Sequence, residues 1–398
     1  MRIARKDYME RLQAWRNRQV IKVITGVRRC GKSVLLEMYA EWLREQGVPE
    51  ERIVRVNLED LDFEPLCQSM ALHSYVKERL VKGKMTYVII DEVQLCENFP
   101  RVVDSLYLRP DIDIYITGSN ASLLSHEIST MLSGRYVEIR MLPLSFREYA
   151  DARPEIAEPQ RLFREYIDGS SFPYAMELAN AERELDAYLD GLYNTILVKD
   201  VLTRRRIQDP LILDSVAKFV FSSIGSELSI KRIADSLTSN GRKTDSKTVE
   251  KYLAALLESF VVYRAERFDI RGRQLLKTQE KYYVVDIGLR RHLLGGRQDV
   301  GHVLENVVYL ELLRRGGKVH VGKIAGSEVD FVVEKSNGTE YYQVASSVRT
   351  PSTMERELAP FSKIRDNHPK ILLTLDEDPS DNIDGIRKLN ALDWLLHG

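Results

Sequence analysis

Short apolar runs alternate with longer amphipathic stretches over the first third of the chain. The runs are rich in β-branched residues, which is typical of strands buried in a parallel sheet. The stretches between them space their apolar residues as helices do when they cover one face of a sheet. Five such runs are present: VIKVIT (20–25), RIVRVNLED (52–60), YVII (87–90), DIDIYIT (111–117) and YVEIRML (136–142). The pattern predicts a parallel, three-layer α/β/α domain.

The rest of the chain changes pattern several times. Residues 159–205 have mostly helical spacing, interrupted by GSSFP (169–173). Residues 211–290 give three amphipathic helices followed by two strands and a hairpin, and GIRKLNALDWLLHG (385–398) predicts a closing helix. We therefore predict an α/β core, a helical lid, a winged helix and a second α/β domain: residues 1–145, 146–208, 209–297 and 298–398.

Charge, apolar runs and cysteine content indicate which partners and which cellular compartment to expect. The chain of 398 residues carries 58 Lys and Arg against 59 Asp and Glu, so overall charge does not indicate a polyanion partner. No apolar run approaches the roughly 20 residues that span a bilayer, and the N-terminus lacks the apolar segment of a secretion signal. Cys30, Cys67 and Cys96 cannot form a disulfide framework. We expect a cytoplasmic protein with no membrane partner.

The stretch GVRRCGKS (26–33) follows the first predicted strand and begins a predicted helix. In a loop of the form G-x-x-x-x-G-K-S, the glycines let backbone N–H groups face the phosphates, and the helix N-terminus adds partial positive charge. Lys32 is expected to reach the β- and γ-phosphates, and Ser33 to hold Mg²⁺. The expected nucleotide contacts are Gly26, Val27, Arg28, Arg29, Cys30, Gly31, Lys32, Ser33 and Val34.

Two arginines and a cysteine occupy the middle of this loop. Because backbone groups hold the phosphates, the side chains of Arg28 and Arg29 are free to point outward. They either add positive potential over the phosphates, bind an acidic surface nearby, or are only solvated. Cys30 is expected to be a small filler rather than a redox switch, although its oxidation would block the site.

A second acidic motif, VIIDE, ends the third predicted strand. Asp91 and Glu92 follow Val88–Ile90, at the carboxyl end of the strand, where α/β sheets place their ligands. Asp91 is expected to hold Mg²⁺ through water, and Glu92 to orient and deprotonate the attacking water. The alternative, two acids that only end a strand, is disfavoured by the phosphate loop upstream.

The next strand and helix offer two further candidates. Thr117 ends the fourth strand and is expected to sense the γ-phosphate or hold the water, with an ordinary turn as the alternative. ASLLSHEISTMLSG (121–134) predicts a helix, and Arg135 follows it. An arginine at this junction is a candidate for a finger that reaches a neighbouring subunit's nucleotide, which would require a homo-oligomer. A solvated or structural arginine is the alternative.

Several segments together resemble one protein family. ITGVRRCGKS, VNLED, VIIDEVQ, YITGSN, LSGRYVEIRMLPLSFREY and SFPYAMEL are similar to prokaryotic AAA-type ATPases of the AAA+ superfamily that carry a C-terminal domain of unknown function. The double arginine before Gly-Lys-Ser is a mark of that group, and the resemblance covers nearly the whole chain. It implies ATP hydrolysis with ATP and Mg²⁺ as cofactors, and it suggests Arg135 as the finger. The choice of adenine also depends on this resemblance.

The winged-helix segment is locally basic. Residues 229–292 contain 14 Lys and Arg against 8 Asp and Glu. The third helix of such a domain enters the major groove, and the hairpin contacts the backbone. The expected contacts with duplex DNA are Lys247, Lys251, Arg271 and Arg273. The alternative is a spacer or a surface for an unknown protein partner.

The last segment resembles the restriction-endonuclease-like fold, in which a helix Glu and a strand Asp precede (Asp/Glu)-x-Lys. Glu305 and Asp330 match the first two positions, but Gln343 and Ala345 stand at the last two. Without that lysine and one carboxylate, metal-assisted cleavage is doubtful. We expect a degenerate nuclease remnant that serves as a scaffold or binding domain.

The leading hypothesis is an Mg²⁺-dependent ATPase whose nucleotide cycle controls the winged-helix and nuclease-like domains on or near DNA. The alternative is a nucleotide-regulated DNA- or protein-binding factor in which hydrolysis is slow and incidental.

Overall fold

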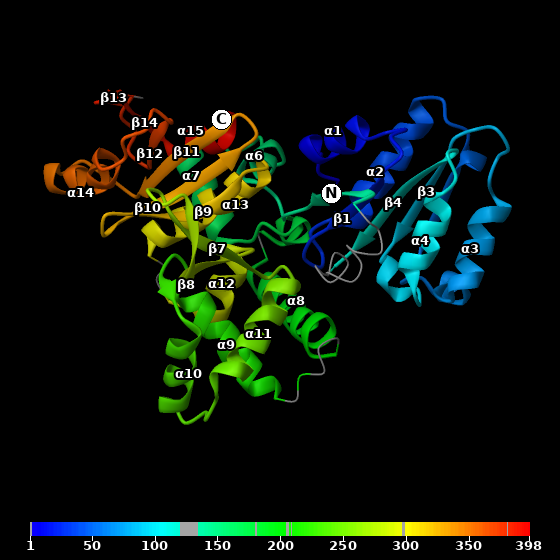
Figure 1. Ribbon diagram of the computed structural model, residues 1–398, viewed down its shortest axis with the longest axis horizontal. Coiled ribbons are helices and arrows are strands. Elements are labelled where there is room, and N and C mark those ends of the chain that lie inside the picture. Colours follow the sequence, from blue (N-terminus) through cyan, green and yellow to red (C-terminus); the bar gives the residue numbers. More distant parts are fainter. Residues whose placement is uncertain are drawn as a thin grey trace. The chain divides into compact units, whose positions relative to one another are not determined.

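The computed structural model describes residues 2–119, 134–179, 181–203, 207, 209–296, 299–379 and 381–398 (Figure 1). Within this part, the chain forms two compact units. The N-terminal unit comprises residues 2–143 with 258–260, and the C-terminal unit comprises residues 144–257 with 261–398. No helix in the described ranges is long and apolar enough to cross a membrane.

The N-terminal unit is built on a five-stranded sheet in the order β2-β3-β4-β1-β5. Every neighbouring pair is parallel, as the apolar runs predicted. The elements are α1 (Lys6–Ala14), β1 (Ile21–Thr25), α2 (Lys32–Glu45), η1 (Glu50–Arg52), β2 (Ile53–Asn57), η2 (Leu61–Cys67), α3 (Ser69–Glu78), β3 (Thr86–Asp91), η3 (Val93–Leu95), α4 (Phe99–Tyr107), β4 (Ile112–Gly118) and β5 (Tyr136–Arg140).

Helices cover both faces of this sheet, so the predicted three layers are present (Figure 1). On one face, apolar residues of α3 and α4 pack on alternate residues of the strands, and Val88, Ile90 and Ile114 are among the buried members. On the other face, the ring of Tyr39 in α2 lies 4.7 Å from the ring of Tyr115 in β4, centroid to centroid. Because the crossover helices fill both faces, the strands read as continuous apolar runs.

The C-terminal unit contains most of the helices in the part of the chain that the structure describes. Its helical elements are α6 (Phe146–Asp151), α7 (Pro159–Asp168), η5 (Pro173–Leu178), α8 (Glu182–Thr195), η6 (Ile196–Thr203), α9 (Pro210–Ser222), α10 (Ile230–Ser239), α11 (Ser246–Glu258), α12 (Ile287–Leu294), α13 (Val300–Arg314), α14 (Pro351–Ser362) and α15 (Ala391–His397). Several of these helices are capped at their N-termini by a side-chain oxygen. For example, Ser229 Oγ accepts a hydrogen bond from Arg232 N at 3.2 Å at the start of α10.

A nine-stranded sheet runs through this unit in the order β13-β14-β12-β11-β10-β9-β7-β8-β6. Its strands are β6 (Glu227–Leu228), β7 (Val262–Asp269), β8 (Gln274–Val284), β9 (Lys318–Ile324), β10 (Ser327–Lys335), β11 (Gly338–Ala345), β12 (Lys370–Thr374), β13 (Asp381–Ile383) and β14 (Ile386–Asn390). The β7–β8 hairpin joins the later strands because β7 pairs with β9 in parallel. Asn306 of α13 also binds this hairpin, since its amide donates to Val284 O at 2.9 Å and accepts from Val284 N at 2.8 Å.

The GSSFP break between α7 and η5 packs closely on the start of α12. Asp286 caps that helix by accepting from Leu289 N at 2.6 Å, and its other oxygen accepts from the backbone N and hydroxyl of Ser171, both at 2.6 Å. A Cβ on Gly288 would lie 1.5 Å from Gly169 O. Gly288 therefore allows a backbone contact that leaves no room for a Cβ at this position.

The prediction of one helix over 385–398 is wrong in its first half, where β14 pairs in parallel with β12 and Asn390 then caps the shorter helix α15. The isolated run Ile386–Asn390 is a strand because it has a neighbouring strand to pair with, which its own sequence does not reveal. The helix predicted over 121–134 lies outside the described residues except for Gly134.

Candidate nucleotide site and second cavity

The turn from β1 into α2 brings the predicted phosphate loop to the carboxyl edge of the five-stranded sheet. Gly26 has φ +150°, and a Cβ there would lie 2.1 Å from Met141 O. Gly31 has φ +104° immediately before α2. The loop glycines are thus required by backbone conformation and by close packing, and the first N–H groups of α2 are left without partners inside the helix.

Lys32 is buried in this loop. Its ammonium donates to Gly26 O at 3.0 Å and to Val27 O at 3.2 Å, and it lies 3.9 Å from Glu92 Oε1. Ser33, one residue further along α2, is exposed. The lysine is therefore held against the loop itself, at the position where phosphate oxygens would replace the carbonyl groups as its partners.

The sheet order places β4 between β1 and β3, so the end of β4 lies between the loop and the two acids. Thr117 bridges them: its hydroxyl donates to Asp91 Oδ1 and accepts from Glu92 N, the latter at 3.0 Å. Glu92 is buried and has a left-handed backbone, with φ +51°. Positive φ in a non-glycine residue is uncommon and recurs at functional sites.

Two neighbours of Glu92 were not among the predicted site residues. Ser119 Oγ donates to Glu92 Oε2 at 3.2 Å, and the amide of Gln94 donates to the same oxygen. The other amide atom of Gln94, Oε1, is buried without a hydrogen-bond partner. The sequence offered a signal for Ser119, which stands beside Thr117 at the strand end, but none for Gln94 because its contact depends on the turn after Glu92.

Arg28, Arg29 and Cys30, in the middle of the loop, have different surroundings. Arg28 pairs with Glu59 Oε1 at 3.0 Å, just beyond β2, while Arg29 is exposed. Cys30 is fully buried, and burial raises the pKa of its thiol. Its carbonyl accepts from Arg5 Nη1 at 3.0 Å. This burial fits a structural filler rather than a reactive thiol.

Arg135 lies at the opposite edge of the sheet from the loop. Its carbonyl accepts from Ile21 N at 2.8 Å at the beginning of β1, whereas the loop follows the end of that strand. Its guanidinium pairs with Asp104 Oδ1 at 2.8 Å and lies 5.4 Å from the centre of the Tyr107 ring. The five residues of β1 separate the two edges by roughly 15 Å, so Arg135 does not serve the nucleotide site of its own chain.

The predicted nuclease residues meet in one cavity of about 670 Å³ in the C-terminal unit. Asp330 Oδ2 accepts from Val344 N at 2.8 Å, and Gln343 Nε2 donates to Glu357 Oε2 at 2.8 Å. Glu305 Oε1 accepts from Tyr283 OH at 2.7 Å. Within the described ranges, no group of three His, Cys, Asp or Glu side chains is arranged to hold a metal ion.

A lysine that the sequence motif lacked enters this cavity from β8. Lys281 Nζ lies 2.9 Å from Glu305 Oε1 and 2.7 Å from Glu328 Oε1, and its side chain is 5% exposed. Burial alone would lower the pKa of Lys281, but the carboxylates of Glu305, Asp330 and Glu328 outweigh it and raise that pKa. Burial, followed by the charge of Glu305, holds the pKa of Asp330 well above its usual range.

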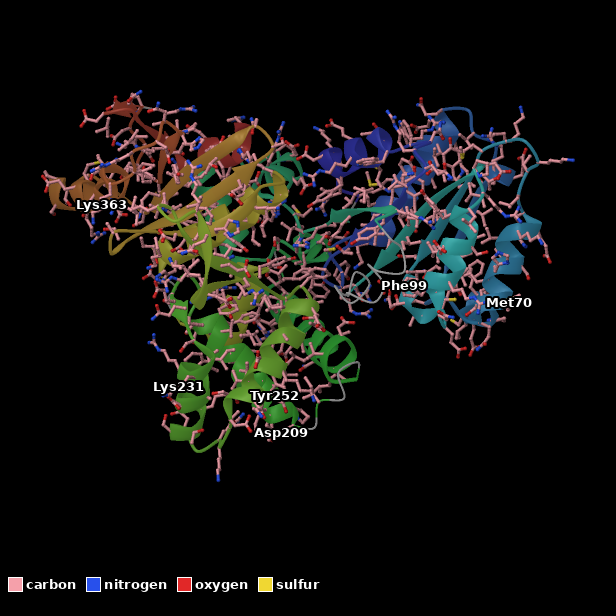
Figure 2. The ribbon with its side chains drawn as sticks, in the orientation of Figure 1. Met70, Phe99, Asp209, Lys231, Tyr252 and Lys363 are labelled. Atoms are coloured by element: carbon pink, nitrogen blue, oxygen red, sulfur yellow. The ribbon has the colours of Figure 1, made fainter. Side chains whose placement is uncertain are left out.

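The four expected DNA contacts are all exposed. Lys247 and Lys251 are one turn apart on α11, and Arg271 and Arg273 lie in the turn between β7 and β8. The three helices and the hairpin occur in the expected order. Lys231 of α10 and Tyr252 of α11 mark this part of the unit in Figure 2.

Comparison with known proteins extends these observations. A family model described as "AAA domain" matches residues 18–150, and one described as "Domain of unknown function (DUF8612)" matches residues 160–299. An uncharacterized protein of Haemophilus influenzae is 37% identical over 99% of this chain and 98% of its own length. The chain belongs to the family of that protein. Its N-terminal unit is an AAA-type P-loop ATPase domain, a fold that implies nucleotide binding.

Two further relatives are more distant. An uncharacterized protein of Methanocaldococcus jannaschii is 28% identical to this AAA protein over 86% of this chain and 78% of its own length. The Walker-type ATPase of Pyrococcus abyssi has a similar structure, with a TM-score of 0.51 and 16% identity, over 73% of this chain and 95% of its own. At this identity, the likeness concerns the fold alone.

Proposed function

We propose that the N-terminal unit binds ATP with Mg²⁺ and hydrolyses it. The observation that carries the proposal is the geometry at the sheet edge, where Lys32, Asp91 and Glu92 come within reach of one another through the loop and Thr117. The exposed Ser33 hydroxyl and the buried Asp91 would hold the cation, which would offset the charge of the phosphates. Glu92 would take the proton of the attacking water.

The decisive test is Glu92→Gln, which keeps the size of the side chain and removes the base. We expect ATP to remain bound, because Lys32 and the loop are intact, while steady-state hydrolysis falls about 100-fold or more. Binding is measured with a fluorescent ATP analogue, and hydrolysis by phosphate release. Lys32→Ala is the companion variant and should lose binding itself. Unchanged turnover in Glu92→Gln would disprove the assigned role.

We also propose that the C-terminal unit contains a winged helix that binds duplex DNA and responds to the nucleotide. The support is the order α9, β6, α10, α11, β7, β8, together with exposed cations on α11 and at the hairpin turn. The test is the ATP hydrolysis rate during a titration with duplex DNA at low and moderate salt. Stimulation that fades with salt supports DNA as the working partner. A rate that ignores DNA at both salt concentrations favours a protein partner instead.

A second candidate function, phosphodiester cleavage, is favoured by one observation. Lys281 of β8 lies beside Glu305 and would serve as the lysine that β11 lacks, and Glu357 of α14 would serve as the carboxylate beside Gln343. Glu305 and Asp330 would hold a divalent cation, since Mg²⁺ commonly takes one or two carboxylates with water and substrate phosphate as its other ligands. Plasmid nicking by the wild type, lost in both Asp330→Asn and Lys281→Met, would establish it, and nicking that survives in both variants would refute it.

A further inference from the structure

A second cavity in the C-terminal unit, of about 440 Å³, joins two segments far apart in sequence. One is the turn between β7 and β8, which contributes Arg271 and Arg273. The other follows α14 and contributes Lys363 and Arg365. Figure 2 marks Lys363 at this place, beside α14. The sequence predicted the two hairpin arginines as DNA contacts, but it did not show that Lys363 and Arg365 lie beside them.

Positive charge predominates among the side chains that line this cavity. Four cationic side chains face it against one carboxylate, that of Asp366. That carboxylate is already engaged: Oδ2 accepts from Tyr341 OH at 2.8 Å, and Oδ1 accepts from His368 N at 3.1 Å. The surplus of positive charge therefore faces the cavity.

The frame around the cavity is part of the folded core. Ile270 N donates to Lys323 O at 3.0 Å, which fixes the hairpin turn to β9. Lys363 Nζ donates to Ser327 Oγ at 2.5 Å and to Ala325 O at 3.4 Å, which fixes the end of α14 to the β9–β10 turn. The floor consists of Ile270, Ile324 and Ile364, which are 8%, 2% and 4% exposed. The four cationic side chains therefore surround a floor of buried isoleucines that belongs to the folded core.

A position at the end of a helix accounts for only one of these cations. A lysine at the C-terminal end of α14 is favoured by the partial negative charge of the last helical carbonyls. Arg271, Arg273 and Arg365 are exposed and lie outside regular helices. Their collection around one cavity, at the cost of mutual repulsion, is what a bound anion would relieve.

We propose that this cavity binds a phosphate of the DNA backbone, so that DNA held by the hairpin also contacts Lys363 and Arg365. The arginine guanidinium groups offer paired donors to phosphate oxygens, and Lys363 adds a point charge. The isoleucine floor accommodates the apolar face of a deoxyribose. The proposal rests on DNA binding by the C-terminal unit and extends it from the hairpin to the second segment.

The test is DNA affinity as a function of salt, measured by fluorescence anisotropy with the full-length protein and a duplex of about 20 base pairs. Each backbone phosphate neutralised contributes about 0.9 to the slope of log affinity against log salt. Lys363→Gln with Arg365→Gln should therefore reduce that slope by about 0.9, for the one phosphate in this cavity, and weaken binding about ten-fold at moderate salt. The control, Lys318→Gln with Arg387→Gln, removes the same charge from two exposed positions elsewhere in the unit and should leave the slope unchanged.

Each other outcome is decisive. If the wild type does not bind DNA, the proposed DNA function fails and this inference fails with it. If Arg271→Gln with Arg273→Gln weakens binding but the Lys363 and Arg365 pair does not, only this inference is overturned. A free anion as the ligand is tested by thermal unfolding with inorganic phosphate. Stabilisation of the wild type alone, with no change in the DNA slope of the variant, would overturn the backbone assignment.

Discussion

The residues between the phosphate loop and the acidic pair have more than one task. Thr117 holds Asp91 through its proton and satisfies the backbone N–H of Glu92 through its oxygen. That N–H belongs to a residue in a left-handed conformation, whose position is not maintained by regular secondary structure. We therefore expect Thr117 to position both acids, since its hydroxyl is hydrogen-bonded to Asp91 and to the backbone of Glu92.

Thr117→Val tests this role. The variant keeps the shape of the side chain but releases Asp91 and leaves the Glu92 N–H unsatisfied, so we expect ATP turnover to fall about 10- to 100-fold. The Mg²⁺ concentration for half-maximal activity should rise as well, because Asp91 loses its orientation. Thr86→Val, a buried threonine at the other end of the same sheet, is the control. Equal turnover in both variants would contradict the assignment.

The three cysteines should differ in reactivity. Burial raises the pKa of Cys96 to about 11 and also raises the pKa of Cys30, whereas Cys67 is partly exposed. Only the thiolate reacts, so a raised pKa leaves the unreactive thiol form at neutral pH. We expect iodoacetamide to modify Cys67 first, and the rate at Cys96 to keep rising between pH 7 and pH 9. Peptide mass spectrometry measures both, and rapid labelling of Cys30 in the folded protein would contradict its structural role.

At the scale of elements, the contact between GSSFP and the start of α12 is unusually close. Asp286 serves both sides of this contact, and Gly288 faces the carbonyl of Gly169 with no room for a side chain. The segment that makes this contact is the one that interrupts the helical spacing, residues 169–173. At this break the backbone of one segment packs directly on the backbone of the other. Local propensity does not predict such packing, because it depends on residues far apart in the sequence.

Gly288→Ala should reduce the free energy of unfolding of the C-terminal unit by about 2 kcal/mol or more, because the added methyl overlaps backbone atoms. Gly191→Ala in α8 is the matched control: a Cβ there meets nothing within 4 Å, so helix propensity should stabilise by about 0.5–1 kcal/mol. Urea unfolding followed by circular dichroism measures both changes. Opposite signs are expected, and a neutral Gly288→Ala would show that the contact relaxes without cost.

Sequence reasoning succeeded where the information is local. The phosphate loop, the acidic pair and their strands follow from runs of a few residues, since strand, loop and helix are consecutive in the chain. It did not find Lys281 or Glu357, which reach the cavity of Glu305 from other elements. It also extended the last helix over β14, because a short strand is defined by its neighbour and not by its own residues. The roles of the site residues remain predictions.

At the scale of the whole molecule, the two units have separate cores, and the nucleotide site belongs to one of them. A ligand that binds only the folded state stabilises it by about 2.7 kcal/mol at a hundred-fold excess over its Kd. We expect calorimetry with Mg²⁺ and ADP to shift one unfolding transition and leave the other in place. Lys32→Ala should abolish the shift. A single transition that moves as a whole would show that the units unfold together.

The pairing of β7 with β9 limits which segments of the gene can be exchanged by recombination. The hairpin and the strands after it share one sheet, so a gene break between α12 and α13 would leave β7 and β9 with open edges. Open edges invite pairing with other chains and aggregation. Replacing the hairpin and its helices by recombination would therefore leave the last hundred residues without the strand that β9 pairs with. Descendants of this gene are expected to retain or lose the two together, even where their functions diverge.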